Sequence, residues 1–372
     1  MITRIEIDGF KSFADFSLDV PPFLLLVGAN ASGKSNLIDA LRLVAESQPG
    51  TGSRTVLDFS RGSADQLFRR HGGGTVARHL SVRVRESAPV SFHPVGGGPA
   101  TTEVLPVTNA LVADLGDPGL TARLDVDWQD DDPRPRVGQV SLFRLTVLFL
   151  DVDPVKAAGR ASASDRQLLS ADAANLAAVL GRFQEQGALA GLVLDASTLV
   201  PALDDIRVFQ DHRGDWDYDL VFREAGALPP ILASHGTLRV LALLAALHDP
   251  SPAVRTVVVD EIETGLHPSR LKALVSIIRR RIDAARHQDG GYPLQVIATT
   301  HSPVVLAQAI HGKDGADVVF VDTAFKREEI DGEAVMSPVT RVRGVGEDGP
   351  RGSYVTPMEV RQFLDTVRQD DW

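Results

Sequence analysis

Residues Gly28 to Ser35 read GANASGKS, which fits the pattern G-x-x-x-x-G-K-[ST]. Glycines let backbone N–H groups curl around a phosphate, and the lysine and serine suit phosphate oxygens and Mg²⁺. An apolar run, FLLLV, precedes the motif as a buried strand would, and SNLIDALRLVAE after it is typical of a helix. This order predicts a loop that binds the phosphates of a nucleotide. The predicted contact residues are Gly28, Ala29, Asn30, Ala31, Ser32, Gly33, Lys34, Ser35 and Asn36.

Two side chains of this loop have specific expected roles. Lys34 is expected to reach the β- and γ-phosphates, and Ser35 to hold Mg²⁺. The N-terminus of the following helix adds positive potential. Asn30 and Asn36 leave two interpretations open, because each can orient phosphate or water and each can equally cap the helix or face solvent.

A second polar group ends a later apolar strand, TVVVDE, at Asp260 and Glu261. Ligands of open α/β sheets bind beyond the carboxyl ends of the strands. Asp260 is therefore expected to reach Mg²⁺, directly or through water, and Glu261 to act as general base on an attacking water. A pair of ordinary helix-capping acids is the alternative, but adjacent buried carboxylates are costly without a cation.

Two further motifs complete the candidate site. VIATTHSP ends the next apolar strand at His301, whose neutral imidazole can bond the γ-phosphate or the water; a structural histidine is the alternative. LASHGTLRVLALLAAL places Ser234 and Gly236 before an apolar helix, where they fit either an N-cap or an anion site. Because the loop at Lys34 already serves the chain's own nucleotide, we expect this turn to face the γ-phosphate of a partner copy.

Composition narrows the classes of protein. The 372 residues suit one large domain with an insertion or two modest domains, and the absence of cysteine excludes disulfides, iron–sulfur clusters and cysteine nucleophiles. The start resembles no signal peptide, and the most apolar later stretch, Val240–Leu247, is too short to cross a bilayer. We expect a cytoplasmic protein without a membrane partner. A net charge of −11 disfavours a free-standing DNA binder.

Hydrophobic periodicity predicts the organisation of the chain. Alternation at Ile5 and Ile7, and again from Phe16, predicts two strands that turn near residues 9–14. The Gly- and Pro-rich segment from about residue 48 to 138 indicates an antiparallel β lobe with long loops. After this segment, predicted strands alternate with predicted helices, which indicates a parallel sheet. We expect one head with three parts: a β-rich lobe with the phosphate loop (1–150), a helical and β insertion with the Ser234 helix (151–250), and a lobe with the Asp260 and His301 strands and a terminal helix (251–372).

The order of these motifs resembles that of the ABC-type ATPase heads. The opening IDGFKSF before GANASGKSNLIDAL, together with DEIETGLHP, is similar to the SMC, RecF and OLD-like branch and to compact ATPases of that kind. The resemblance covers Met1 to about Leu43 and about Ile231 to Val321. It implies a P-loop NTPase fold of the α/β class, with an antiparallel β-rich lobe and a mixed, mainly parallel sheet flanked by helices. It also implies ATP hydrolysis with Mg²⁺ in a homodimer closed around ATP.

The sequence departs from that branch in several places. The signature reads Ala-Ser-His-Gly, so His235 would make hydrolysis depend on pH. The 188 or so residues between the two motif groups contain no heptad run, which excludes long coiled-coil arms. Gln66 and Gln139 are both candidates for the glutamine that links nucleotide to the second lobe. The part after His301 lacks the acidic cluster of a TOPRIM nuclease.

Basic residues leave DNA binding open. Lys11 and Ser12, in the hairpin that contributes to the adenine side of such heads, either approach nucleotide or DNA or lie on the surface. A cluster including Arg69, Arg70 and Arg78 fits DNA binding and a solvated face equally, and Arg279–Arg281 suit the end of a helix.

Three functions follow from this resemblance. The first is a DNA-linked role in repair, chromosome maintenance or anti-phage defence, with a nuclease or toxin as effector partner. The second is the ATPase subunit of an ABC transporter, which GFKSF and DEIETGLHP disfavour. The third is a non-hydrolysing ATP sensor that regulates a partner.

Overall fold

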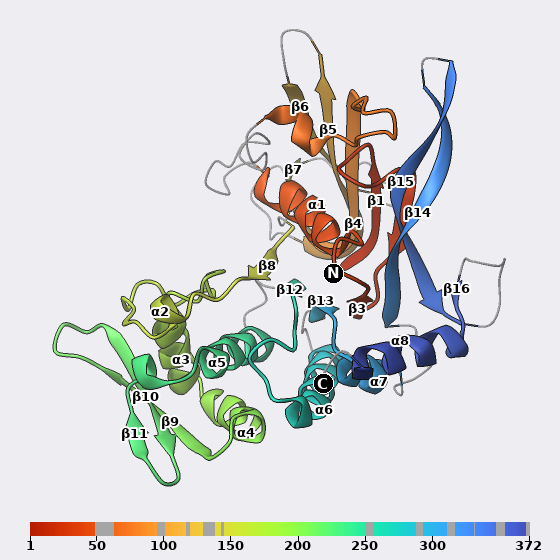
Figure 1. Ribbon diagram of the computed structural model, residues 1–372. Helices are drawn as coiled ribbons and strands as arrows, with labels where there is room; N and C mark the ends of the chain where they lie inside the picture. Colours follow the sequence, from red (N-terminus) through yellow and green to blue (C-terminus); the bar gives the residue numbers. More distant parts are fainter. Residues whose placement is uncertain are drawn as a thin grey trace.

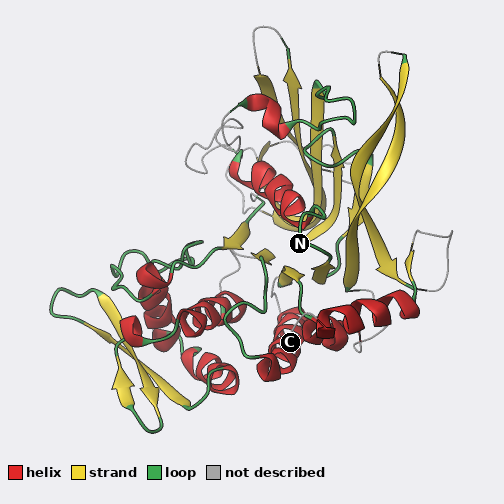
Figure 2. Ribbon diagram, in the orientation of Figure 1, coloured by secondary structure: helices red, strands yellow, loops and turns green. Residues whose placement is uncertain are grey.

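A computed structural model describes residues 1–48, 63–94, 101–116, 120–128, 138–142, 145–249, 256–287, 293–310, 317–330, 332–346 and 354–369. A mixed, mainly parallel sheet lies between an antiparallel β lobe and a group of helices (Figures 1 and 2). This arrangement confirms the fold class expected from the sequence. The Gly- and Pro-rich stretches 95–100 and 129–137 lie outside the described residues.

The antiparallel lobe begins with the predicted hairpin. Its strands run in the order β2-β1-β4-β5-β6, with β7 beside β4. Ile5 pairs with Leu18 and Ile7 with Phe16, and all four side chains are buried, as their alternation requires. The strands of this lobe are β1 (Ile2–Asp8), β2 (Phe16–Asp19), β4 (His79–Pro94), β5 (Thr101–Leu115), β6 (Leu120–Trp128) and β7 (Gly138–Leu142).

The central sheet has the order β16-β15-β14-β3-β13-β12-β8, and β14, β3, β13, β12 and β8 run parallel. Side chains of β3 alternate between two cores: Leu24 and Leu26 pack with helix α1 and the antiparallel lobe, and Leu25 and Val27 pack with the helices on the other face. The strands are β3 (Phe23–Val27), β8 (Val147–Leu150), β12 (Thr256–Val259), β13 (Gln295–Thr300), β14 (Val318–Ile330), β15 (Glu333–Val345) and β16 (Tyr354–Val355).

Helices cover both faces of the sheet. Helix α1 lies on the side of the antiparallel lobe, and the other long helices lie on the opposite side with a small sheet of β9, β10 and β11 (Figure 1). The remaining elements are α1 (Lys34–Glu46), η2 (Ala64–Leu67), α2 (Pro154–Ala157), α3 (Leu176–Glu185), α4 (Leu189–Leu199), β9 (Leu203–Gln210), β10 (Trp216–Phe222), β11 (Gly226–Leu228), η3 (Pro230–Leu232), α5 (His235–His248), α6 (Pro268–Arg286), α7 (Pro303–Ile310) and α8 (Pro357–Gln369).

Two local features can be compared with the sequence directly. The terminal helix has a capping box, because the Thr356 N–H donates to Glu359 and the Glu359 N–H donates to the Thr356 hydroxyl. No helix among the described ranges has both the length and the apolar character that a membrane span needs. The division of the chain at residues 150 and 250 stays a prediction; β3 lies in the central sheet, whereas β1 and β2 lie in the antiparallel one.

Strands β14 and β15 form a long hairpin that the sequence analysis missed. Beyond Phe320, β14 no longer pairs with β3 and pairs only with β15, so the hairpin projects beside the antiparallel lobe (Figure 1). An ion pair ties it to that lobe: Arg69 donates two hydrogen bonds, of 2.8 and 2.7 Å, to the Glu328 carboxylate. The Arg69 side chain is buried, and this hydrogen bonding is the main cause that lowers the pKa of Glu328 to about 2.

Replacing Glu328 with Gln should lower the free energy of unfolding by about 2 kcal/mol at pH 7, because Arg69 loses its charged partner. The pKa of Glu328 is lower in the folded chain than the ordinary value of 4.5, so this stabilisation is complete above about pH 4.5 and is lost as the pH falls toward 2. Urea denaturation of both proteins across this pH range measures the difference. Glu329→Gln, at an exposed neighbouring position, is the control. Equal free energies of unfolding for Glu328→Gln and the unaltered chain at pH 7 would contradict a stabilising role of the Arg69–Glu328 pair.

Candidate active site

The phosphate loop joins β3 to α1 as predicted. Gly33 precedes α1 with a φ of 107°, and no described side chain caps the helix. A Cβ at Gly33 would lie 2.1 Å from the Thr340 hydroxyl oxygen, so both the backbone angle and the close approach require glycine. The N–H groups of the first helical turn therefore stay available for an anion such as phosphate.

Lys34 lies inside this loop. Its side chain is almost fully buried, and its Nζ donates to the carbonyl oxygens of Gly28 (2.7 Å) and Ala29 (2.9 Å). Burial lowers the pKa of the Lys34 ammonium, whereas the carboxylates of Asp260, Glu261 and Glu263 act in the opposite direction. Phosphate oxygens could replace the two carbonyl acceptors without any exposure of the ammonium to bulk water.

The turn of the first hairpin supports the phosphate loop. The Ser12 hydroxyl accepts a hydrogen bond from Asn36 Nδ2 (2.8 Å) and lies 2.7 Å from the Thr340 hydroxyl of β15. Lys11 pairs with Asp39 of α1 at 2.5 Å. Both hairpin residues are half-buried. The structure therefore places Lys11 and Ser12 against the phosphate loop and its helix. A contact of either residue with nucleotide or DNA stays a prediction.

The predicted acidic pair and the histidine meet at one edge of the central sheet. Val27 pairs with Thr300 and Val259 with Ala298, so the phosphate loop, Asp260 and His301 all follow neighbouring strand ends. His301 Nε2 lies 3.9 Å from Glu261 Oε1. The structure thus brings together the groups that the sequence analysis took from three separate motifs, and their catalytic roles stay predictions.

Glu261 has an unusual backbone. Its φ of 48° lies in the left-handed region, which costs a residue with a Cβ about 1 kcal/mol. Its side chain is 54% exposed and therefore accessible from the open edge of the sheet. Such conformations gather at functional sites when neighbouring groups hold them in place. This backbone angle therefore supports a specific orientation of the Glu261 side chain.

Glu263 is a site residue that the sequence analysis missed. Its Oε1 accepts the His301 N–H (2.7 Å), and its Oε2 accepts the Thr300 hydroxyl (2.8 Å). The carboxylate thereby joins the loop after β12 to the end of β13 and holds His301. The sequence did contain a signal for it, because Glu263 is the third acid of DEIE, two residues after Glu261.

The Ser234 turn lies on the surface. Ser234 is the N-cap of α5, where its hydroxyl oxygen accepts the Thr237 N–H at 3.1 Å, and its side chain is exposed. A Cβ at Gly236 would lie 2.2 Å from the Gly265 carbonyl oxygen, so the turn packs on the loop that follows Glu261. The N-cap is therefore observed, and the anion site for a partner's phosphate stays a prediction.

Neither glutamine candidate lies at the end of an inner strand. Gln66 belongs to η2, and Gln139 pairs with His93 in the antiparallel lobe. Because Leu150 pairs with Val259, the residue level with Asp260 on the next strand is Asp151. Asp151 borders a cavity of about 430 Å³.

The donor set fits Mg²⁺ that arrives with a nucleotide. Ser35 and Asp260 are the residues that would hold it, and both are exposed. No group of three or more His, Cys, Asp or Glu side chains in the described ranges could hold a metal. Mg²⁺ commonly uses one or two carboxylates with phosphate oxygens and water, so this sparse set is sufficient.

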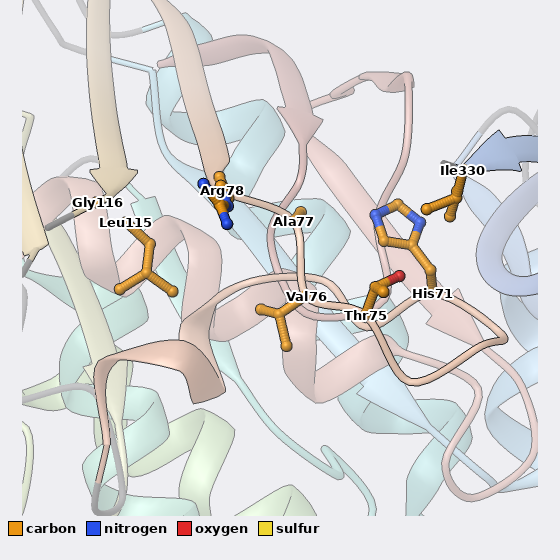
Figure 3. A pocket seen from close by; sticks show the side chains of 8 residues that line it. All are labelled: His71, Thr75, Val76, Ala77, Arg78, Leu115, Gly116 and Ile330. Carbon is orange, nitrogen blue, oxygen red and sulfur yellow. The ribbon is translucent and has the colours of Figure 1, made fainter. Parts of the chain in front are cut away.

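The basic cluster of the antiparallel lobe is largely neutralised. Besides the Arg69–Glu328 pair, Arg70 pairs with Asp65 and Arg85 with Glu6. A cavity of about 920 Å³ at this lobe is lined by His71, Thr75, Val76, Ala77, Arg78, Leu115, Gly116 and Ile330 (Figure 3). That lining includes none of the predicted nucleotide contacts. These ion pairs favour the interpretation of the cluster as a structural and solvated face.

Two models of ATPase families match parts of this chain. A model described as "AAA domain, putative AbiEii toxin, Type IV TA system" matches residues 151–307, and one described as "AAA ATPase domain" matches residues 1–69. The chromosome partition protein Smc of Methanocaldococcus jannaschii is 50% identical over 44 residues, or 12% of this chain and 4% of that protein. The DNA replication and repair protein RecF of Brucella abortus is 32% identical over 100 residues, or 26% and 24%.

These matches span about a quarter or less of the length of the two curated relatives. Among solved structures, the Smc head domain of Pyrococcus furiosus, with an extended coiled coil and bound to the C-terminal domain of ScpA, has a TM-score of 0.57. It is 14% identical, and the superposition covers 99% of both chains, which shows a shared fold. The chain therefore has the fold of an ATPase head of the AAA/ABC type, and it is similar to the heads of Smc proteins and to RecF.

Glu263→Gln should lower the rate of ATP hydrolysis about tenfold and leave ATP affinity within about twofold. An amide offers one acceptor oxygen, so the site loses at least one of the two bonds that hold Thr300 and His301. Steady-state turnover and calorimetric ATP titration measure the two effects. Glu224→Gln, an exposed acid between β10 and β11, is the control. Unchanged turnover would show that Glu263 does not position His301.

Proposed function

We propose that the chain binds ATP with Mg²⁺, hydrolyses it to ADP and phosphate, and closes face to face with a second copy during each cycle. The observation that carries the proposal is the shared sheet edge, where Lys34, Asp260, Glu261 and His301 follow neighbouring parallel strands. Lys34 and the free N–H groups of α1 would hold the β- and γ-phosphates, as the buried ammonium and uncapped helix favour.

Hydrolysis at this edge needs a water activated by the protein. Glu261 would accept one proton from that water while the water oxygen attacks the γ-phosphorus, the bond to the bridging oxygen breaks, and ADP leaves. Ser35 and Asp260 would hold Mg²⁺, which would supply positive charge to the phosphate oxygens. His301, 3.9 Å from Glu261, would hydrogen-bond the water or the γ-phosphate.

A second copy would complete the site. Lys34 and the acidic pair would approach the nucleotide from one chain, and Ser234 and His235 of the turn are exposed on that chain's surface. Ile231 and Leu232, just before this turn, are 61% and 67% exposed. Apolar side chains beside an exposed anion-binding turn favour burial against a second copy that brings its own triphosphate.

We propose that the resulting switch acts in a DNA-linked process in the cytoplasm, in repair, chromosome maintenance or anti-phage defence, with a nuclease or toxin as effector. The names of the matched proteins, Smc and RecF, and the AbiEii-type family support this role. The basic cluster of the antiparallel lobe does not support it, because Arg69, Arg70 and Arg85 are paired with acidic side chains. A gel shift with duplex DNA at two salt concentrations, with and without ATP, tests it: binding that needs ATP and weakens with salt would support the role. Copurification with a membrane permease instead would favour a transporter subunit.

Lys34→Ala should weaken ATP binding at least about 100-fold, because the buried ammonium is the main cation of the loop. Glu261→Gln should keep ATP affinity and lower turnover at least about 100-fold, since it removes the general base. Calorimetry and phosphate release measure these effects. Lys272→Ala, at an exposed position on α6, is the control for the lysine change.

Two results would overturn this assignment. Unchanged ATP affinity in Lys34→Ala would refute the phosphate loop. ATP binding without measurable turnover in the unaltered chain would identify a non-hydrolysing sensor.

A further inference from the structure

Thr299 is fully buried at the end of β13, directly beside the acidic pair. Its hydroxyl donates to Asp260 Oδ1 at 2.5 Å and accepts the Glu261 N–H at 2.8 Å. Its backbone carbonyl oxygen accepts the Ile262 N–H at 3.0 Å. One residue thus bonds three consecutive residues of the loop after β12.

The direction of these bonds matters for the site. A hydroxyl has one proton, and here it points to the Asp260 carboxylate, which leaves a lone pair for the Glu261 N–H. This bond fixes one carboxylate oxygen of Asp260, and the other has no hydrogen bond in the described part of the chain and can take a ligand. The same hydroxyl holds the backbone of Glu261, whose φ of 48° is left-handed and unfavourable without support.

We propose that Thr299 is a positioning residue for ATP hydrolysis, which sets the orientation of the Asp260 carboxylate toward Mg²⁺ and the backbone of Glu261 toward the water. This inference rests on the proposed function. Thr299 acts on two residues with different predicted roles, so its loss should affect both the use of Mg²⁺ and the rate of the chemical step. A threonine that served packing alone would affect neither selectively.

Thr299→Val keeps the shape and burial of the side chain and removes only the hydroxyl, and Thr299→Ser keeps the hydroxyl. We expect kcat to fall about 10- to 100-fold in the valine variant, as is typical when a group that orients a metal ligand is lost. The Mg²⁺ concentration for half-maximal binding of a fluorescent ATP analogue should rise several-fold, and affinity in EDTA should not change. The serine variant should recover most of both properties.

Thr256→Val is the matched control. Thr256 is a buried threonine at the opposite end of β12, where its hydroxyl donates to Gln295 at 3.0 Å. It should leave turnover and Mg²⁺ dependence unchanged, and thermal melting of all variants shows whether they fold.

The outcomes separate this inference from the proposed function. If the unaltered chain hydrolyses ATP and Thr299→Val matches it in kcat and Mg²⁺ dependence, the role of Thr299 is wrong and the function stands. If the unaltered chain has no turnover, the proposed hydrolysis fails, and the Mg²⁺ dependence of analogue binding still decides on Thr299. Equal losses in the valine and serine variants would also refute the role of the hydroxyl.

Discussion

The alignment of parallel strand ends is the constraint on which the site depends. Five parallel strands run through the central sheet, and the registers of β3, β13 and β12 bring the phosphate loop, His301 and Asp260 to the same edge. A shift of any strand by one residue would turn its polar end toward a different face. The inner strands are buried on both sides and mostly apolar, so packing in two cores fixes the registers that the chemistry needs.

Hydrogen bonds across the edge convert this alignment into defined side-chain positions. Thr299 holds the acidic pair, and Glu263 holds the backbone of His301, so the ends of β12 and β13 are joined in both directions. On the other side of the loop, Ser12 and Thr340 support Asn36 and Gly33. The hairpin at the start of the chain and the β14–β15 hairpin near its end therefore act as supports for one phosphate loop.

Local patterns in the sequence predicted the strand, loop and helix around the phosphate loop, and together with the resemblance to ABC-type heads they predicted the fold class. The contact between Ser12 and Thr340 joins residues 328 positions apart, and no local pattern predicts it. Threonine is a common β-branched residue in strands, so the sequence does not single out Thr299. Its role emerges only when its position beside Asp260 on the neighbouring strand is known. The β14–β15 hairpin was missed because the outer half of β14 has no period-two apolar pattern and carries the polar run Lys326–Glu329. Its side chains there are half-buried or exposed, and ion pairs such as Arg69–Glu328 hold the hairpin against the antiparallel lobe.

In the proposed cycle two copies share each triphosphate, and substitutions in the Ser234 turn are a direct test of this sharing. Ser234→Asp keeps a good N-cap but brings a negative charge to the turn, and Ser234→Asn keeps the cap without the charge. Each change is combined with Glu261→Gln, and molar mass is measured by light scattering at saturating ATP. We expect dimers for Glu261→Gln alone and with Ser234→Asn, and ATP-bound monomers with Ser234→Asp. Dimers in all three proteins, or loss of ATP affinity with Ser234→Asp, would contradict it.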